Sequence, residues 1–467
     1  MAIKGFENHP YIPNSNPKVQ AEMLEFLGLK SFDDLHAEVP SEIKLKENLK
    51  LEPAFGSEYE LCRGINKMLS KNQSTADKLS FLGAGCWPHY VPAVCDEIAG
   101  RAEFLSGYAG EPYNDLGRFQ SLFEYESLVA ELVDMEVVNV PTFDWAQAAA
   151  TAVRMAARIN GRSKVLVYGG IDPRKLSVMK NYGRHALDFE LLNYCPKTGQ
   201  MDLDDLKAKL DEETACVYFE NPAFLGFLET QGQEIADLAH SKGAELVVGV
   251  DPSSLGILEA PRNYGADIVC GELQPLGLHM NFGGGLGGFM ATMNEEKYVA
   301  EFPSRLFGMA PTKVDGEYGF GDIYYDRTSF GNLREKGKEY VGTQAAMAGI
   351  VSGVYLALMG PEGMRELGQN VMQKNLYAQK KLAELPGVKA PRFDNAVYCE
   401  FVVDFNETGK TVAEINQSLL ERDIFGGHDL SSDFPALGQS ALYCFTEVHL
   451  QEDIDRLVAE LRDILGK

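Results

Sequence analysis

Six short β-branched runs alternate with amphipathic segments between residues 164 and 292, and this alternation limits the possible fold more than any other feature. The strand-like runs are residues 164–170, 187–193, 215–221, 245–251, 267–272 and 287–292. Segments with helical periodicity separate them, for example "MDLDDLKAKLDEE" and "QGQEIADLAHSKG". Strands separated by helices form βαβ units, whose parallel strands are covered on both faces. The sequence therefore predicts a large α/β domain with a parallel-rich sheet over residues 76–335.

Two further parts flank this domain. Residues 1–75 contain helical pieces separated by proline and asparagine, with Asn16 as a predicted N-cap and Pro17 at the first helical position. Residues 336–467 begin with a long helical stretch and continue as a small α+β part. We expect an N-terminal helical arm that clasps something larger, the large domain, and then a linking helix with a small C-terminal domain.

Charge excludes several classes of partner. The chain has 43 basic and 68 acidic side chains, a net charge of −25. Such a field repels phosphate backbones and anionic lipid, so neither nucleic-acid binding nor membrane binding is expected. No run approaches 18 consecutive apolar residues and the first residues lack an apolar signal region. We expect a soluble, cytoplasmic protein.

The eight cysteines are scattered and never form a CxxC pair. Several lie in apolar runs, such as Cys216 in "ACVYFEN" and Cys444 in "ALYCFTEV". Buried, reduced thiols explain this pattern better than disulfides or a metal site. No metal ligands are predicted.

The layout is that of the aspartate-aminotransferase type of pyridoxal-phosphate enzyme, and the residues test this analogy. Such an enzyme needs an acid at the pyridinium nitrogen, a lysine for the Schiff base, and a helix N-terminus with small residues for the phosphate. Asp251 ends the strand 245–251, at the edge where ligands bind in open α/β sheets. It is either the pyridinium acid or the cap of the turn that follows, and its position alone leaves both open.

The lysine is missing. None occurs between Lys242 and Lys297, and Gln274 stands 23 positions after Asp251, in the usual range for it. A carboxamide cannot form a Schiff base. We therefore expect no cofactor bound covalently by this chain, and no catalytic residue within it.

The turn that would bind the phosphate is also altered. It contains Phe143, Asp144 and Trp145 in place of glycine, serine or threonine, and the Asp144 carboxylate would repel a phosphate. By its own residues this chain is not a self-sufficient pyridoxal enzyme.

Nine motifs, spread along nearly the whole chain, match one protein family in the right order. They are "HPYIPNS" near the start, "SFLGAGCWPHYVPAV" (80–94), "FEYESLVAEL" (123–132), "VDPSSLGIL" (250–258), "FGGGLGGFMAT" (282–292), "REK" (334–336), "YLALMGPEGMREL" (355–367), "ERDIFGGHDLSSDFP" (421–435) and the closing "CFTEVHLQEDIDRLVAELRDIL". On these motifs the chain resembles subunit 1 (alpha) of the two-subunit glycine dehydrogenase (decarboxylating), the P-protein of the glycine cleavage system.

The resemblance implies a division of labour between two subunits. In this family the homologous beta subunit carries the lysine and pyridoxal phosphate, and alpha has glutamine at the lysine position, as Gln274 does here. The family reaction is glycine decarboxylation, with transfer of the aminomethyl group to the lipoyl arm of the H-protein. Alpha and beta subunits pair, and the pairs form a heterotetramer. Alone, this chain is expected to be inactive.

The chain departs from the family in polar loops, at 106–118, 143–148, 272–277 and 338–345. In the family, the first of these would approach the active site of the beta subunit. It holds four candidate interface or substrate-site residues: Tyr108, Glu111, Tyr113 and Asn114. The alternative is a surface turn fixed by its glycine and proline. Loops carry binding, so the changes put the substrate in question more than the fold.

Two histidines could be polar site groups: His89 in "WPHYVPAV", as an interface or substrate-site candidate, and His279 in "LGLHMNF", beside Asp251 and Gln274 in a vestigial cofactor site. A histidine between apolar residues is more often a core residue with a satisfied hydrogen bond, and we favour that role for both. "NFGGGLGG" (281–288) is interpreted as a tight turn into a strand rather than an anion cradle.

Four functions compete on this evidence. The first is the non-cofactor subunit of a glycine-decarboxylase complex. The second is a paralogous subunit whose complex acts on another amino acid or amine. The third is a purely structural partner that contributes no site residue. The fourth, an independent aminotransferase or lyase, is disfavoured by Gln274.

Overall fold

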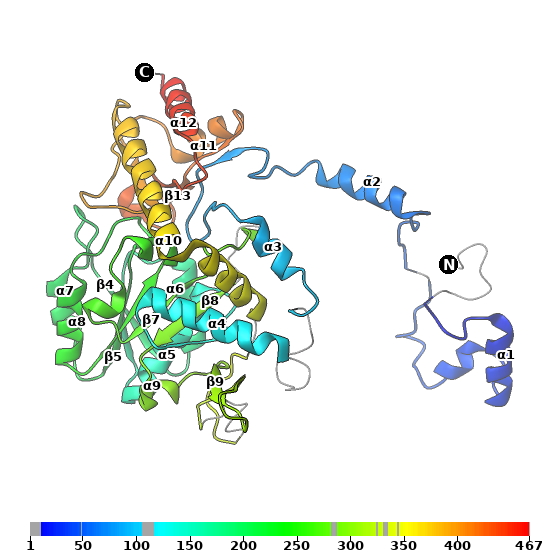
Figure 1. Ribbon diagram of the computed structural model, residues 1–467. Coiled ribbons are helices and arrows are strands. Elements are labelled where there is room, and N and C mark those ends of the chain that lie inside the picture. The colour runs from blue at the N-terminus through cyan, green and yellow to red at the C-terminus, as the bar shows by residue number, and fades with distance from the viewer. Residues whose placement is uncertain are drawn as a thin grey trace. The chain divides into compact units, whose positions relative to one another are not determined.

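The computed structural model describes residues 11–47, 49–104, 116–281, 287–323, 326–329, 335–342 and 345–466 (Figure 1). Tyr108, Glu111, Tyr113 and Asn114 lie outside these described residues. The chain divides into two compact units, Met1–Gln73 and Ser74–Lys467.

The N-terminal unit is built from capped helices that bury nothing. It contains α1 (Pro17–Phe26), η1 (Phe32–His36) and α2 (Glu58–Leu69). The Asn16 side chain accepts from Lys18 N at 2.8 Å and so caps α1 as predicted, and Ser57 caps α2. None of the described residues 11–73 is buried, and large apolar side chains such as Phe26 are exposed. Local capping, rather than packing, defines these helices.

The main unit is organised around a seven-stranded sheet with the order β2-β8-β7-β6-β5-β3-β4. The strands are β2 (Val137–Val138), β3 (Lys164–Tyr168), β4 (Asp188–Leu192), β5 (Thr214–Glu220), β6 (Glu245–Val250), β7 (Ile268–Glu272) and β8 (Gly288–Thr292). Strand β8 is antiparallel to β2 and β7, and the other pairs are parallel. The predicted parallel-rich sheet is confirmed, with strands close to the predicted runs.

Helices cover this sheet. They are α3 (Ala93–Ala99), α4 (Leu116–Val133), α5 (Trp145–Asn160), α6 (Pro173–Gly183), α7 (Leu203–Lys209), α8 (Gly232–Ser241) and the short α9 (Glu296–Val299), with 3-10 turns η2 (Pro252–Gly256) and η3 (Pro261–Tyr264). Helix α5 packs across β5, β6, β7 and β8. Its buried alanines, such as Ala148 and Ala152, allow this close approach and place its N-terminus beside the ends of the strands.

A long helix, α10 (Ala346–Ala383), connects the sheet to the C-terminal part. It packs along α4 and reaches α12, as Figure 1 shows. It is kinked at Gly360, whose φ of 59° is left-handed, directly before Pro361. A separate hairpin, β9 (Phe307–Pro311) and β10 (Tyr318–Asp322), precedes it.

The C-terminal part is a small α+β layer. Its sheet has the order β11-β14-β13, from β11 (Glu400–Asp404), β14 (Ser440–Cys444) and β13 (His428–Asp429). Helices α11 (Val412–Leu420) and α12 (Gln451–Ile464) and the turn η5 (Pro435–Leu437) complete it. The sequence did not predict that β1 (Leu79–Ser80) pairs with β12 (Ile424–Phe425) in this part. That pairing directs the following segment towards the main sheet. Within the described residues, no helix is long and apolar enough to cross a membrane.

Candidate functional site

Three buried carboxylates mark the carboxyl edge of the central strands. Glu220 ends β5, Asp251 follows β6 and Glu272 ends β7, and each is at most 3% exposed. A cavity of about 20 Å³ opens here, room for about one water molecule. Its lining includes Trp87, Trp145, Asp172, Lys175, Glu220, Phe224, Asp251, Cys399 and Glu400. This is the edge at which open α/β sheets bind ligands.

Asp251 both caps a turn and faces the cavity. Ser253 donates to its Oδ1 from N at 2.9 Å and from Oγ at 2.7 Å, and Cys399 Sγ lies 3.7 Å from its Oδ2. Burial raises the pKa of Asp251, against the nearby His89. Asp251 therefore has the capping role, which is one of the two that the sequence left open, and its role as a pyridinium acid stays a prediction.

Gln274 is buried and fully engaged with the chain itself. Its Oε1 accepts from Trp87 N at 3.0 Å, and its Nε2 donates to Trp87 O at 3.0 Å and to Leu278 O at 3.2 Å. A side-chain carboxamide can form hydrogen bonds with both the N–H and the C=O of one residue because it offers both a donor and an acceptor. At the predicted lysine position, this side chain holds a segment that is distant in sequence.

The indole of Trp87 lines the pocket. It is 4% exposed, its ring centroid lies 6.5 Å from that of Trp145, and its Nε1 donates to Glu400 Oε2 at 2.7 Å. Ala84 N donates to Glu400 Oε1 at 2.6 Å. Burial raises the pKa of Glu400 to about 7. Trp87 and Glu400 are site residues that no sequence motif or spacing indicated.

A lysine does occupy the pocket, but from another element. Lys175, in the first turn of α6, places Nζ 2.6 Å from Glu220 Oε1 and 3.3 Å from the ring centroid of Trp145. Tyr218 donates to the same carboxylate oxygen at 2.8 Å. The search for a lysine after Asp251 could not find Lys175, which precedes that strand.

The N-terminus of α5, where a phosphate would bind, is occupied by the chain's own acceptors. Gln147 N donates to Asp144 Oδ1 at 2.7 Å and Trp145 N donates to Glu272 Oε2 at 3.0 Å. Phe143 N donates to Gln147 Oε1 at 2.9 Å. Burial, helped by Asp144, raises the pKa of Glu272 to about 8 although three backbone N–H groups lower it. An anion binds at a helix N-terminus through free N–H groups. Here these three N–H groups already donate to side chains of the chain itself.

Pyridoxal phosphate therefore does not fit the residues of this pocket. Gln274 cannot form a Schiff base, the cavity that Trp87 and Trp145 line has a volume of only about 20 Å³, and carboxylates hold the amides that a phosphate would need. In the described part of the chain, no three histidine, cysteine, aspartate or glutamate side chains gather as metal ligands.

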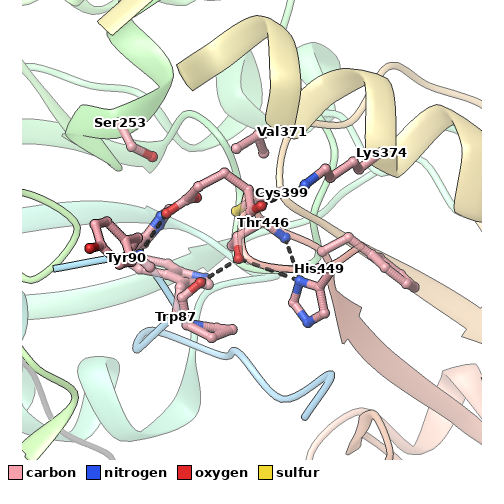
Figure 2. Close-up of polar contacts among 12 residues, drawn as sticks. Trp87, Tyr90, Ser253, Val371, Lys374, Cys399, Thr446 and His449 are labelled. Atoms are coloured by element: carbon pink, nitrogen blue, oxygen red, sulfur yellow. Dashed lines mark hydrogen bonds and ion pairs between the residues drawn. The ribbon is translucent and has the colours of Figure 1, made fainter. Parts of the chain in front are cut away.

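His89 lies buried next to this pocket. Its side chain is 1% exposed, and Nδ1 lies 2.8 Å from Glu447 Oε2. Tyr90 N donates to Glu447 Oε1 at 2.7 Å, and Thr446 Oγ1 donates to Pro88 O. Figure 2 shows Thr446 between His449 on one side and Trp87 and Tyr90 on the other. The expectation of a buried, hydrogen-bonded histidine is met at His89 through Nδ1.

The same expectation is wrong for His279. Its side chain is 63% exposed and lies on the surface, with Nε2 3.0 Å from Asp96 Oδ1. The chain turns outward after the buried Leu278, so His279 does not join Asp251 and Gln274. Of the glycine-rich run 281–288, residues 282–286 lie outside the described residues.

Known proteins with the same layout identify the family. The family model described as glycine cleavage system P-protein matches residues 9–461. A probable glycine dehydrogenase (decarboxylating) subunit 1 from Staphylothermus marinus is 38% identical over 99% of this chain and 99% of its own length. The protein of the same description from Pyrococcus horikoshii is 38% identical over 98% of this chain and 100% of its own.

Solved structures agree. A crystal structure of glycine decarboxylase (P-protein) of the glycine cleavage system, in inhibitor-bound form, has a TM-score of 0.84 at 32% identity over 98% of this chain and 100% of that one. A NifS-like protein from Rickettsia africae shares the fold alone, with a TM-score of 0.61 at 11% identity, covering 84% of this chain and 100% of its own. The chain therefore belongs to the glycine cleavage system P-protein family.

Proposed function

We propose that this chain is the non-cofactor subunit of a glycine decarboxylase complex. The observation that carries the proposal is Gln274, which lies at the predicted lysine position and is bonded to Trp87 N and O in a chain that matches subunit 1 proteins end to end. The cofactor, pyridoxal phosphate, then belongs to a homologous second subunit. The complex would decarboxylate glycine and pass the aminomethyl group to the lipoyl arm of an H-protein.

Features of the N-terminal unit support the proposal that a second subunit is the partner. Its helices are ten and twelve residues long and bury no residue, although they carry Phe26, Leu27 and Met68. Helices of this length are marginal in water unless an apolar face is covered. We propose that the homologous subunit supplies that cover, within a heterotetramer. In sedimentation of the co-expressed chains, Phe26→Ser with Met68→Ser should weaken the complex, whereas the surface control Lys67→Ser should not.

Reconstitution tests the proposed activity. This chain, purified alone, should catalyse no exchange of carbon dioxide with the glycine carboxyl group. Co-purified with a homologous chain that carries the cofactor lysine, it should do so in the presence of lipoylated H-protein. Exchange by the second chain alone at the full rate would contradict the proposal and favour a purely structural role.

A second candidate, a paralogous complex for another amino acid or an amine, is favoured by the sequence of the loop 106–118. Glu111 and Asp115 place negative charge in that loop. If Tyr108, Glu111, Tyr113 and Asn114 approach the substrate, these charges disfavour a carboxylate and favour a cation. Glu111→Gln should then change the order of kcat/KM among substrates, while Glu97→Gln on α3 should not. Unchanged kcat/KM for every accepted substrate would make the loop a surface turn.

A further inference from the structure

The segment 81–90 runs from one part of the main unit into another. It begins where Phe81 N donates to Phe425 O at 2.9 Å, beside the pairing of β1 with β12 in the C-terminal part. It then enters the pocket at the carboxyl edge of β5 and β6, where Trp87 lines the cavity. The segment therefore contacts the C-terminal sheet and the main sheet within ten residues.

Polar contacts hold the segment from both sides. On the side of the main sheet, Gln274 binds the N–H and C=O of Trp87, both at 3.0 Å. On the C-terminal side, Glu400 accepts from Ala84 N at 2.6 Å and from the Trp87 indole at 2.7 Å. Glu447 accepts from Tyr90 N at 2.7 Å. Trp87 is the residue that both sides bind.

The contacts of the Trp87 indole resemble those of a bound ligand. It is enclosed, it packs against a second aromatic ring, Trp145, and its single donor meets a buried acceptor, Glu400. Indoles carry one N–H and a large apolar body, so a buried acceptor next to aromatic and aliphatic walls recognises them. Phe224 and Gly226 line the cavity beside the indole, and a Cβ at Gly226 would clash with the backbone of Glu400 and Phe401.

We propose that the space between Glu400 and Trp145, beside the cavity at the carboxyl edge of β5 and β6, is a binding site for an indole, which the chain supplies itself: Trp87 acts as an intramolecular ligand that joins the main sheet to the C-terminal part. The chemical class that this site takes is a flat aromatic molecule with one N–H donor. This inference does not depend on the proposed function, because it concerns only what occupies this space.

Replacing the ligand tests the proposal. In full-length Trp87→Gly, the space of the indole should be vacant, and the Glu400 acceptor and the Trp145 ring that contact the indole should be free to bind an added one. The variant should unfold at a lower temperature than the wild type. Added indole should raise that temperature and bind one molecule per chain in equilibrium dialysis. Naphthalene, which lacks the N–H, should raise it less. The wild type should bind neither.

The controls separate this result from general destabilisation. Tyr90→Ala removes an aromatic side chain from the same segment, but one that is 66% exposed, and it should neither lower the unfolding temperature to the same extent nor create indole binding. A folded Trp87→Gly that gains no stability from indole would overturn the proposal, as would equal binding to the wild type. If Trp87→Gly does not fold, Trp87→Phe decides: an unfolding temperature equal to that of Tyr90→Ala would overturn it.

Discussion

The ammonium of Lys175 and the carboxylate of Glu220 form an ion pair of 2.6 Å inside the pocket, with only 8% and 3% of their side chains exposed. Both charges are largely shielded from bulk water. Burying two charges is costly, and each depends on the other once both are buried. Removal of one member would leave the other, beside Trp145, buried without its opposite charge.

Lys175→Met should therefore destabilise the protein strongly, by about 3–5 kcal/mol, because Glu220 keeps a buried charge without a counterion. The double variant Lys175→Met with Glu220→Gln should recover most of that loss. Urea unfolding of both variants measures the effect. The matched control is Lys197→Met, whose ion pair with Asp394 is exposed and 3.7 Å long, and which should cost less than about 1 kcal/mol. Equal stability of Lys175→Met and Lys197→Met would contradict the account.

Gln274→Ala should loosen the segment 81–90. It leaves Trp87 N and O buried without their partners, at a cost of roughly 1–3 kcal/mol for each group. Amide hydrogen exchange should become faster at Trp87 and its neighbours. Gln233→Ala, which removes an exposed hydrogen bond to Asp237, serves as the control and should leave these amides unchanged. Unaltered exchange in Gln274→Ala would show that the contact to Trp87 does not hold the segment.

Much of the fold could be predicted from the sequence because most of its strands are short, mainly apolar runs. Each of β3 to β8 is bounded by polar or turn residues, so it is visible without knowledge of its neighbours. β1 and β12 are two residues each, and no local pattern reveals so short a pair. The candidate site was predicted only where chain spacing helps, as for Gln274 after Asp251.

The rest of the site comes from segments that meet only in three dimensions. Trp87 arrives from the segment after β1, Lys175 from α6 and Glu400 from β11, and a single sequence does not report such contacts. His279 shows the opposite error: apolar neighbours predicted burial, but the chain turns outward there. The roles of Tyr108, Glu111, Tyr113 and Asn114 stay predictions.

The free energy of unfolding should fall as the pH rises from the unfolded-state pKa of Glu272 to its folded-state pKa. Burial raises its pKa from 4.5 to about 8, so the folded state binds a proton that the unfolded state releases. Because the folded state binds this proton more tightly, Glu272 contributes its full stabilisation below pH 4.5. That contribution is lost as the pH rises through 8. Glu272→Gln keeps an acceptor oxygen for Trp145 N and removes the titration. Its urea midpoint should depend less on pH between 4.5 and 8 than that of the wild type.

The control for this titration is Glu234→Gln, at an exposed position in the first turn of α8. The urea midpoint of this variant should depend on pH as that of the wild type does. A Glu272→Gln protein whose urea midpoint follows the wild-type curve would show that Glu272 does not carry the effect.

In the proposed complex, this chain holds no cofactor and the second subunit does. The most direct measurement is borohydride reduction of the reconstituted complex with pyridoxal phosphate, followed by mass spectrometry of both chains. The account predicts a pyridoxyl group on one lysine of the second subunit and none on this chain, including its variant Gln274→Lys, in which Asp144 and Glu272 still accept from the amides that a phosphate would need. A pyridoxyl group within the pocket of the wild-type chain, on Lys175 above all, would contradict it.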